Sequence, residues 1–162
     1  MKQRNFEVEY KKMCNWMGMF LGSRYYTKLG DMEKIFASFA IAPFIDSLVS
    51  EQQILPEDWN EQNLEHFCLV IIPNCSCSQV DFPTNQTKIL EAFFLYLQEN
   101  KVIKNGDVLA KKVRSIELEI IEAMKNSEFG KMARKIMTPM TINVDDFRDE
   151  NGQIQRPQIF TF

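Results

Sequence analysis

The chain has 162 residues and a net charge of −3, and 45% of its residues are hydrophobic. This is the size and composition of one globular domain that buries its own core without disulfides or a structural metal. Thirteen phenylalanines and nine methionines favour a core of large, adaptable side chains, and favour helices over sheets.

Membrane and export segments are not expected. The longest apolar run, residues 67–72, is too short to cross a bilayer. An export signal near the start is excluded because Glu7 and Glu9 stand where basic residues are needed, and Asn15 interrupts the apolar run. We therefore expect a cytoplasmic protein whose four cysteines are reduced thiols.

Charge is distributed unevenly along the chain. Basic residues predominate in residues 1–30 and 101–135, and acidic residues predominate in residues 31–100. We interpret this as internal complementarity, in which basic first and last helices pack around an acidic middle. The negative net charge argues against a dedicated nucleic-acid binder.

Apolar residues recur at helical spacing in the first part of the chain. A helix is expected over residues 5–21, with one buried stripe. The members of this stripe are Phe6, Tyr10, Met13, Met17 and Phe20. A second helix is expected over residues 31–49, capped by Asp31 and kinked or restarted at Pro43, which lacks an amide proton. Its expected inward stripe is Ile35, Phe36, Phe39 and Ala40.

The middle of the chain predicts two more helices. The third covers residues 60–72; a hydrophobic staple between Trp59 and Leu64 opens it, and Pro73 ends it. The fourth begins at a Thr84 cap. Its expected buried face is Ile89, Leu90, Phe93, Phe94 and Leu97.

Two further helices complete the expected bundle. After a turn at Asn105-Gly106, a fifth helix starts at Asp107, and a short sixth helix is capped by Ser127 and stopped by Pro139. The stripe of the fifth is Leu109, Val113, Ile116, Ile120 and Met124, and that of the sixth is Met132, Ile136 and Met137. We therefore expect residues 1–140 to form an all-α domain, a compact bundle of five to six helices.

Residues 141–162 differ in character and are expected to form a C-terminal tail docked on the domain or on a partner protomer. Asn151-Gly152 is a strong hairpin-turn signal, and polar and apolar residues alternate after it. A β-hairpin and an extended tail are both compatible with this pattern. Because aromatic side chains at a chain end are stabilised by burial, we expect Ile159, Phe160 and Phe162 to bind in a groove.

One cluster of residues has the chemistry of metal ligands. His66, Cys68, Cys75 and Cys77 lie within twelve residues of one another. However, His66 and Cys68 are two positions apart on an expected helix and point to different faces. A single Cys-x-Cys is a weaker pattern than two Cys-x-x-Cys pairs. We therefore expect no metal and no cofactor, and interpret these cysteines as buried or loop thiols; His66, Cys75 and Cys77 are the weak metal candidate.

Basic residues gather in residues 111–135. Lys131, Arg134 and Lys135 share one face of the expected sixth helix, and this face is a candidate surface for a phosphate or an acidic partner. The simpler interpretation is the solvated face of an amphipathic helix.

The order of landmarks over residues 55–137 resembles an uncharacterised helical domain of bacterial hypothetical proteins. The landmarks are Leu55-Pro56-Glu57-Asp58-Trp59, Ile72-Pro73 and Phe129-Gly130-Lys131-Met132-Ala133-Arg134-Lys135. In that family a tryptophan-led helix ends in a leucine–proline pair, and the last helix opens with an aromatic–glycine pair followed by alanine–lysine. The chain departs from the family after Pro73, where Asn74-Cys75-Ser76-Cys77 replaces basic residues. The resemblance implies an all-helical fold and carries no activity and no functional residues.

No catalytic constellation accompanies the helices, since the chain has one histidine and no glycine-rich phosphate loop. Our hypothesis is a non-enzymatic helical interaction module of a bacterial cytoplasmic protein, with a protein partner or self-association. One alternative is a nucleic-acid-associated regulatory protein that uses the basic surface of residues 111–135. A second alternative is small-molecule binding in a cavity lined by phenylalanine and methionine.

Overall fold

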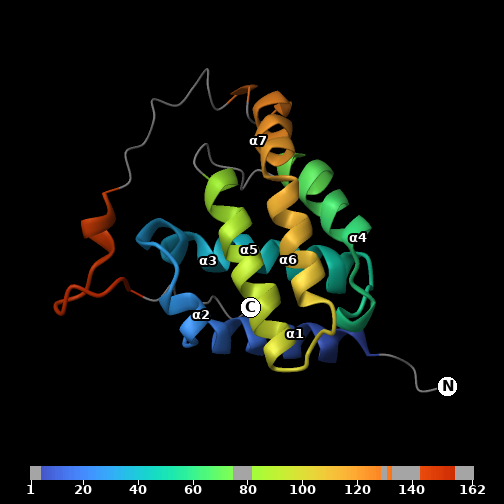
Figure 1. Ribbon diagram of the computed structural model, residues 1–162, viewed down its shortest axis with the longest axis horizontal. Coiled ribbons are helices and arrows are strands. Elements are labelled where there is room, and N and C mark those ends of the chain that lie inside the picture. The colour runs from blue at the N-terminus through green and yellow to red at the C-terminus, as the bar shows by residue number, and fades with distance from the viewer. Residues whose placement is uncertain (1–4, 75–81, 129–130, 133–142, 156–162) are drawn as a thin grey trace.

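The computed structural model describes residues 5–74, 82–128, 131–132 and 143–155, and for residues 82–84 it describes the backbone alone. These residues contain seven α-helices and no strand (Figure 1), so the expected all-α fold is confirmed. The helices form a compact bundle, and the segment 143–155 lies at one side of it.

Helix α5 (Phe82–Glu99) is the centre of the bundle. It packs most extensively against α6 (Gly106–Ser115) and then against α3 (Asp31–Ile45). Helices α1 (Phe6–Phe20), α2 (Arg24–Thr27) and α7 (Glu117–Asn126) also contact α5. The fourth helix was expected to start at a Thr84 cap, but α5 starts at Phe82 and includes Thr84 in its first turn.

Two of the expected helices change their winding along their length. Helix α3 passes through Pro43 and continues as a π-helical turn, η1 (Asp46–Glu51). After a 3₁₀ turn η2 (Pro56–Asp58), α4 (Glu61–His66) continues as a π-helical turn η3 (Phe67–Ile71) and a 3₁₀ turn η4 (Ile72–Asn74). The expected third helix is therefore helical from Glu61 to Asn74, with Pro73 near its end.

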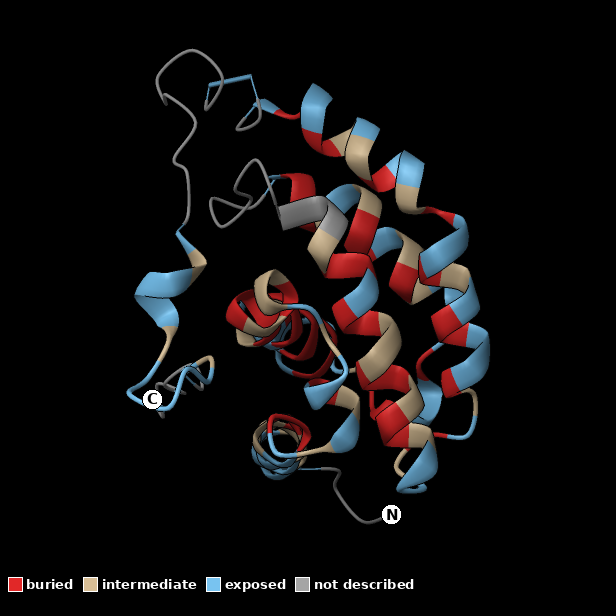
Figure 2. Ribbon diagram, turned by 60° about the vertical axis from the view of Figure 1, so that its left-hand side comes forward, coloured by how far each residue is buried: buried red, intermediate tan, exposed pale blue. Residues whose placement is uncertain are grey.

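The core is built around aromatic side chains. Phe44 of α3 is fully buried, and its ring meets those of Trp59, Phe67 and Phe94 edge to face. The three centroid distances are 4.9, 5.1 and 5.3 Å. Edge-to-face contact brings the positive rim of one ring to the negative face of another, so these contacts add to the hydrophobic stabilisation. Figure 2 shows that the buried residues lie where the helices face one another.

The expected inward stripe of α3 was wrong at one position. Phe39 is 59% exposed, whereas Phe36, Ala40 and Phe44 are buried. These three buried residues follow one another at four-residue spacing, while Phe39 lies three positions beyond Phe36 and outside that row. Phe39 is therefore a surface aromatic residue rather than a core residue.

The expected fifth helix is two helices, because the chain breaks at Ile116. The backbone of Ile116 has φ −102° and ψ 11°, outside the helical region, and α7 starts at the next residue. Just before the break, the hydroxyl of Ser115 donates a hydrogen bond to the carbonyl of Lys112 at 2.7 Å. A side chain that competes for a helix carbonyl in this way weakens the following turn. Ile116 stays buried, so the apolar stripe runs across the break.

The expected charge complementarity is present in the bundle. Ion pairs join the basic flanks of the sequence to its acidic middle, as in Arg24–Glu99, Lys112–Glu65 and Arg114–Glu91. Each joins two different helical elements. Each surface ion pair of this kind contributes little to the free energy of unfolding. Together they favour the observed pairing of neighbouring helices, because opposite charges face each other there.

Candidate interaction site

Of the cysteines and the histidine considered as metal ligands, the structure describes only His66 and Cys68. His66 lies at the end of α4, whereas Cys68 is fully buried in η3, and the two point in different directions as expected. Cys75 and Cys77 lie outside the described residues. Among the residues that the structure does describe, no three histidine, cysteine or acidic side chains are grouped as metal ligands.

Cys68 behaves as a buried apolar side chain. Burial raises the pKa of its thiol from 9.0 to about 12, because a thiolate is not solvated inside the core. We expect Cys68 to resist alkylation by iodoacetamide in the folded protein and to react once urea unfolds it. Peptide mapping by mass spectrometry measures this, and rapid native labelling of Cys68 would contradict its position in the core.

The same shift predicts how stability depends on pH. The folded state holds the Cys68 proton up to about pH 12, whereas the unfolded state releases it above pH 9. The contribution of Cys68 to stability is therefore complete below pH 9 and decreases as pH rises, by about 1.4 kcal/mol per pH unit. Urea titrations across this window measure the slope, which Cys68→Ala should reduce.

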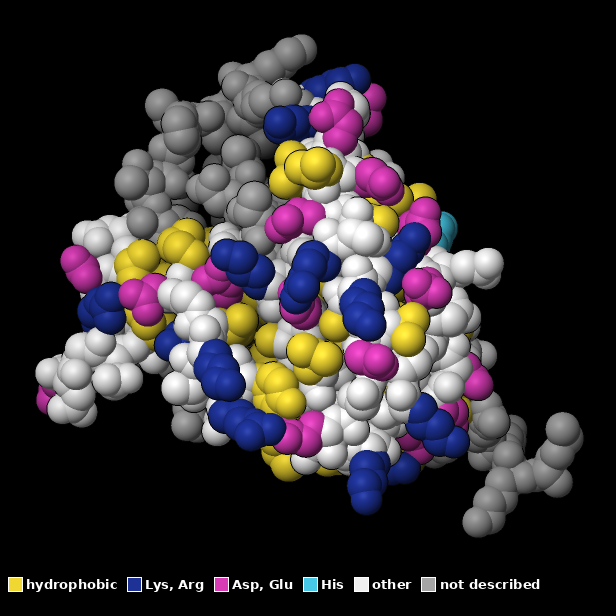
Figure 3. All heavy atoms as spheres, viewed as in Figure 1, with side chains coloured by type: hydrophobic (Ala, Val, Ile, Leu, Met, Phe, Trp, Pro, Cys, Tyr) yellow, Lys and Arg dark blue, Asp and Glu magenta, His cyan; other side chains and the backbone are white. Residues whose placement is uncertain are grey.

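Two of the basic side chains in residues 111–135, Lys112 and Arg114, are paired with carboxylates of other helices. Lys112 lies 2.6 Å from a carboxylate oxygen of Glu65, and Arg114 pairs with Glu91. Figure 3 shows basic and acidic side chains interspersed on the face that carries α5 and α6. Lys131 is exposed, and Arg134 and Lys135 lie outside the described residues. Carboxylate partners reduce the positive potential that a phosphate backbone would need.

The second alternative would place phenylalanines around a cavity, whereas in the described core several of them pack against one another. The phenylalanine rings at its centre contact one another directly, as in Phe20–Phe93 at 5.4 Å between centroids. This is the packing of an ordinary helical core.

The tail residues expected to bind a groove, Ile159, Phe160 and Phe162, lie outside the described residues. The described part of the tail, residues 143–155, is called the C-terminal hairpin below. It contains the 3₁₀ turn η5 (Val144–Phe147) and a single antiparallel bridge between Arg148 and Ile154. The expected turn at Asn151-Gly152 is therefore present, but the described residues contain no β-ribbon.

The turn of the C-terminal hairpin is held by Asp149. One carboxylate oxygen of Asp149 accepts hydrogen bonds from the amides of Asn151 at 2.9 Å and Gln153 at 3.0 Å. Gly152 has φ +75°, a conformation that glycine adopts without strain. Aspartate accepting from an amide two residues on is a common way to fix a tight turn.

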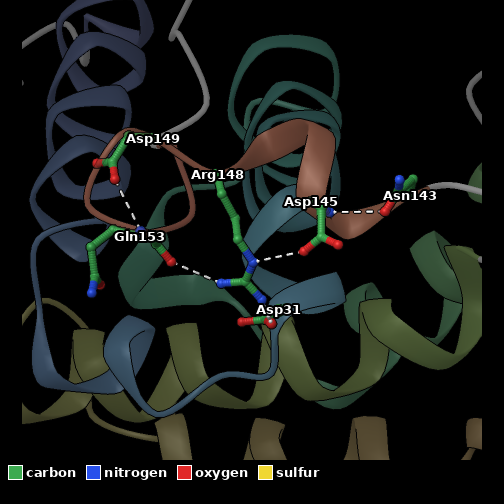
Figure 4. Close-up of polar contacts among 7 residues, drawn as sticks. Asp31, Asn143, Asp145, Arg148, Asp149 and Gln153 are labelled. Carbon is green, nitrogen blue, oxygen red and sulfur yellow. Dashed lines mark hydrogen bonds and ion pairs between the residues drawn. The ribbon is translucent and has the colours of Figure 1, made fainter.

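Arg148 links the C-terminal hairpin to the bundle (Figure 4). Its Nη2 donates to Oδ2 of Asp31 at 2.7 Å, and its Nε donates to Oδ1 of Asp145 at 3.1 Å. Its Nη1 donates to the carbonyl oxygen of Gly152 at 2.9 Å. The hydrogen bonds to Asp145 and Asp31 raise the pKa of Arg148, so its guanidinium stays charged. The Arg148 side chain therefore stabilises the turn of the C-terminal hairpin and also connects the hairpin to α3.

Asp31 is placed to receive this contact by the start of α3. It was expected as the helix cap, but Gly30 occupies the cap position and Asp31 is the first helical residue. A carboxylate in the first turn is favoured by the helix dipole. Here it also binds a residue 117 positions away in the sequence.

Asp31, Ile35 and Phe39 follow one another at four-residue spacing on α3, and we call them the α3 stripe. Ile35 is 7% exposed although it lies outside the cluster of mutually packed core residues. The turn η5 contacts α3, and its last residue, Phe147, is 39% exposed. The α3 stripe thus begins at the hairpin contact and ends in an uncovered aromatic ring.

Sequence reasoning missed Asp31, Arg148 and Phe39 as members of one site. Asp31 was interpreted as a cap, Phe39 as core, and Arg148 only as part of the C-terminal tail. The available signal was the aromatic–basic pair Phe147-Arg148 within an otherwise acidic segment.

Comparisons with protein-family models, curated proteins and solved structures found no match for this chain. Within the described ranges, no helix combines the length and the apolar character that crossing a bilayer requires.

Proposed function

We propose that the chain is a non-enzymatic helical protein-interaction module of a bacterial cytoplasmic protein, and that it binds a second copy of itself. The surface used is the α3 stripe together with the C-terminal hairpin. The observation that carries the proposal is the uncovered Phe39, 59% exposed, on the same side of α3 as the hairpin contact.

A second copy is the partner that the charge pattern of this surface favours. The chain carries both an acidic–apolar stripe on α3 and an aromatic–basic pair, Phe147-Arg148, whose arginine binds that stripe. When a surface and its complement lie on one chain, two copies can face each other about a two-fold axis, so that each contact occurs twice. Burying the exposed phenylalanines in such an interface adds hydrophobic stabilisation, about 1.5–3 kcal/mol for a full side chain.

The test is native mass spectrometry and light scattering of the full chain over a range of concentrations. We expect a dimer, and we expect Phe39→Ser to weaken it about tenfold or more, because two phenylalanines leave the interface.

Leu118→Ser is the matched control. Leu118 is 80% exposed on α7, a helix that packs mainly against α5 and η3. This variant should dimerise like the original chain. A chain that stays monomeric up to its solubility limit would overturn the proposal, and so would equal loss of dimer in both variants.

A further inference from the structure

We propose that Asn151 is a site of spontaneous covalent modification, at which its side-chain amide becomes a carboxylate with loss of ammonia, and that this change loosens the contacts of Arg148. The inference goes beyond the proposed self-association and does not depend on it. Two asparagines of the chain precede a glycine, Asn105 and Asn151. Steric hindrance to the reaction is least in such a pair, because glycine has no side chain beside its amide nitrogen.

The reaction needs only the asparagine, the glycine and water. The backbone nitrogen of the glycine attacks Cγ of the asparagine side chain, and the bond between Cγ and the side-chain nitrogen breaks. That nitrogen takes up the proton of the glycine amide and leaves as ammonia. Water then opens the cyclic imide, with no oxidant or reductant involved. Opening at the side-chain carbonyl gives aspartate, and opening at the backbone carbonyl gives isoaspartate, in which the main chain runs through the former side chain.

The fold leaves Asn151 open to this reaction. Asn151 and Gly152 are both exposed in the turn of the C-terminal hairpin. The amide of Gly152 donates a hydrogen bond to the carbonyl of Asp149 at 2.9 Å, and this bond has to open before the nitrogen attacks. A hydrogen bond in an exposed turn opens at a low cost in free energy, because water replaces the lost partner. The turn therefore slows the reaction at Asn151 without preventing it.

The second asparagine–glycine pair, Asn105-Gly106, is fixed at the start of α6. The side-chain nitrogen of Asn105 donates to the carbonyl of Trp59 at 2.8 Å, and its backbone carbonyl accepts from the amide of Leu109 at 3.0 Å. Gly106 is buried, and a Cβ added to it would overlap the carbonyl oxygen of Phe94. Rotation of the Asn105 side chain onto the Gly106 nitrogen has to break the hydrogen bond to Trp59, in a packed part of the bundle that opens rarely. The structure thus distinguishes two sites that are alike in the sequence.

Conversion of Asn151 changes the turn that Arg148 stabilises. One carboxylate oxygen of Asp149 accepts hydrogen bonds from the amides of Asn151 and Gln153. Isoaspartate inserts one more carbon atom into the main chain between these two amides, so that they no longer meet the same oxygen. The carbonyl of Gly152, which accepts from Nη1 of Arg148, is displaced by the same insertion. The guanidinium of Arg148 then loses one of the acceptors that fix its position.

The first test is to age the full chain in dilute solution at mildly alkaline pH, which favours loss of the amide proton, and to follow its peptides by mass spectrometry. Replacement of NH2 by OH raises the mass of the peptide that carries the converted residue. We expect Asn151 to convert about tenfold faster than Asn105 or more, because an exposed turn opens more easily than a packed helix start. The matched control is the same chain aged in urea, where both pairs are unfolded and should convert at similar rates.

The second test measures the loosening of Arg148 by trypsin, which cleaves after an arginine whose side chain is free to enter its binding pocket. In the folded chain the guanidinium of Arg148 is held by Asp31, Asp145 and Gly152. We expect cleavage after Arg148 to be about tenfold faster in the isoaspartate form, since proteolysis follows the population of the opened state. Asn151→Ser is the matched control, because serine cannot form the imide. Its cleavage rate should not change when this variant is aged in the same way.

Equal conversion of Asn105 and Asn151 in the folded chain, or faster conversion of Asn105, would overturn the modification site, because the fold would then not protect Asn105. Isoaspartate in place of Asn151 without faster cleavage after Arg148 would overturn the loosening of the arginine. Faster cleavage in aged Asn151→Ser would do the same, because ageing would then act elsewhere in the chain. A chain that converts at Asn151 and stays monomeric would support this inference and overturn the proposed self-association alone.

Discussion

Replacing Phe44 with alanine is expected to lower the free energy of unfolding by about 3–5 kcal/mol, the range for large aromatic truncations in a packed core. Phe44 is fully buried and meets three other aromatic rings edge to face. The truncation removes these contacts and leaves a cavity between α3, α5 and the segment around Trp59. A loss of this size is a large part of the stability of an ordinary domain.

Urea unfolding followed by the fluorescence of the two tryptophans measures the loss. Phe39→Ala is the control, because it removes the same side chain from the same helix at a position that is 59% exposed. Phe39→Ala should change stability by no more than about 0.5 kcal/mol in the monomer. Equal losses at the two positions would contradict the orientation of α3, and with it the assignment of Phe39 to the surface.

The helices were predictable because each carries a local pattern. The expected stripe of α1 is buried at Met13, Met17 and Phe20 and only partly buried at Phe6 and Tyr10. The stripe from Leu109 to Met124 is buried as the spacing predicts. Caps were less predictable: Asn60 caps α4 through the amides of Gln62 and Asn63, but α3 and α6 have no side-chain cap. Tertiary packing fixes those helix starts.

The orientation of α3 was not predictable in full, because nearly every position in it is apolar or small. Between Ile35 and Ile45, Phe39 and Ala42 are exposed, and the sequence does not distinguish them from their buried neighbours. The reverse occurs in α5, where Gln86 is fully buried although it is polar. In both helices the neighbours in space decide the burial of a residue.

Of the candidate site, only the turn at Asn151-Gly152 could be predicted from the sequence. Asn151-Gly152 is a local signal, and the structure has the turn there. The pairing of Asp31 with Arg148 joins two ends of the chain, and no spacing rule connects residues so far apart. The uneven charge distribution predicts that ion pairs form between the basic and acidic segments. Which residue pairs with which depends on the fold.

Gly106→Ala is expected to lower the free energy of unfolding by about 1–3 kcal/mol, as overpacking of a tight contact does. A Cβ at Gly106 would overlap the carbonyl oxygen of Phe94 and lie 2.7 Å from Cβ of Gln98. Both neighbours belong to α5, so α6 has to move away from the central helix. Gln98 also accepts a hydrogen bond from the amide of Asp107 at 2.7 Å, which substitutes for a cap on α6. The displacement therefore weakens both the packing of α6 on α5 and the hydrogen bond at the start of α6.

Gly22→Ala is the matched control for this effect. At Gly22 the nearest atom to an added Cβ is the carbonyl oxygen of Met19 at 3.6 Å, an ordinary contact. Because alanine also restricts the unfolded chain, this variant should be unchanged or more stable by up to about 1 kcal/mol. Opposite signs for the two substitutions would show that Gly106 is required for the close approach of α6 to α5. If Gly106→Ala were neutral, the two helices would have to be farther apart than described. The turn at Asn105-Gly106 would then be the whole reason for this glycine, as the sequence alone suggests.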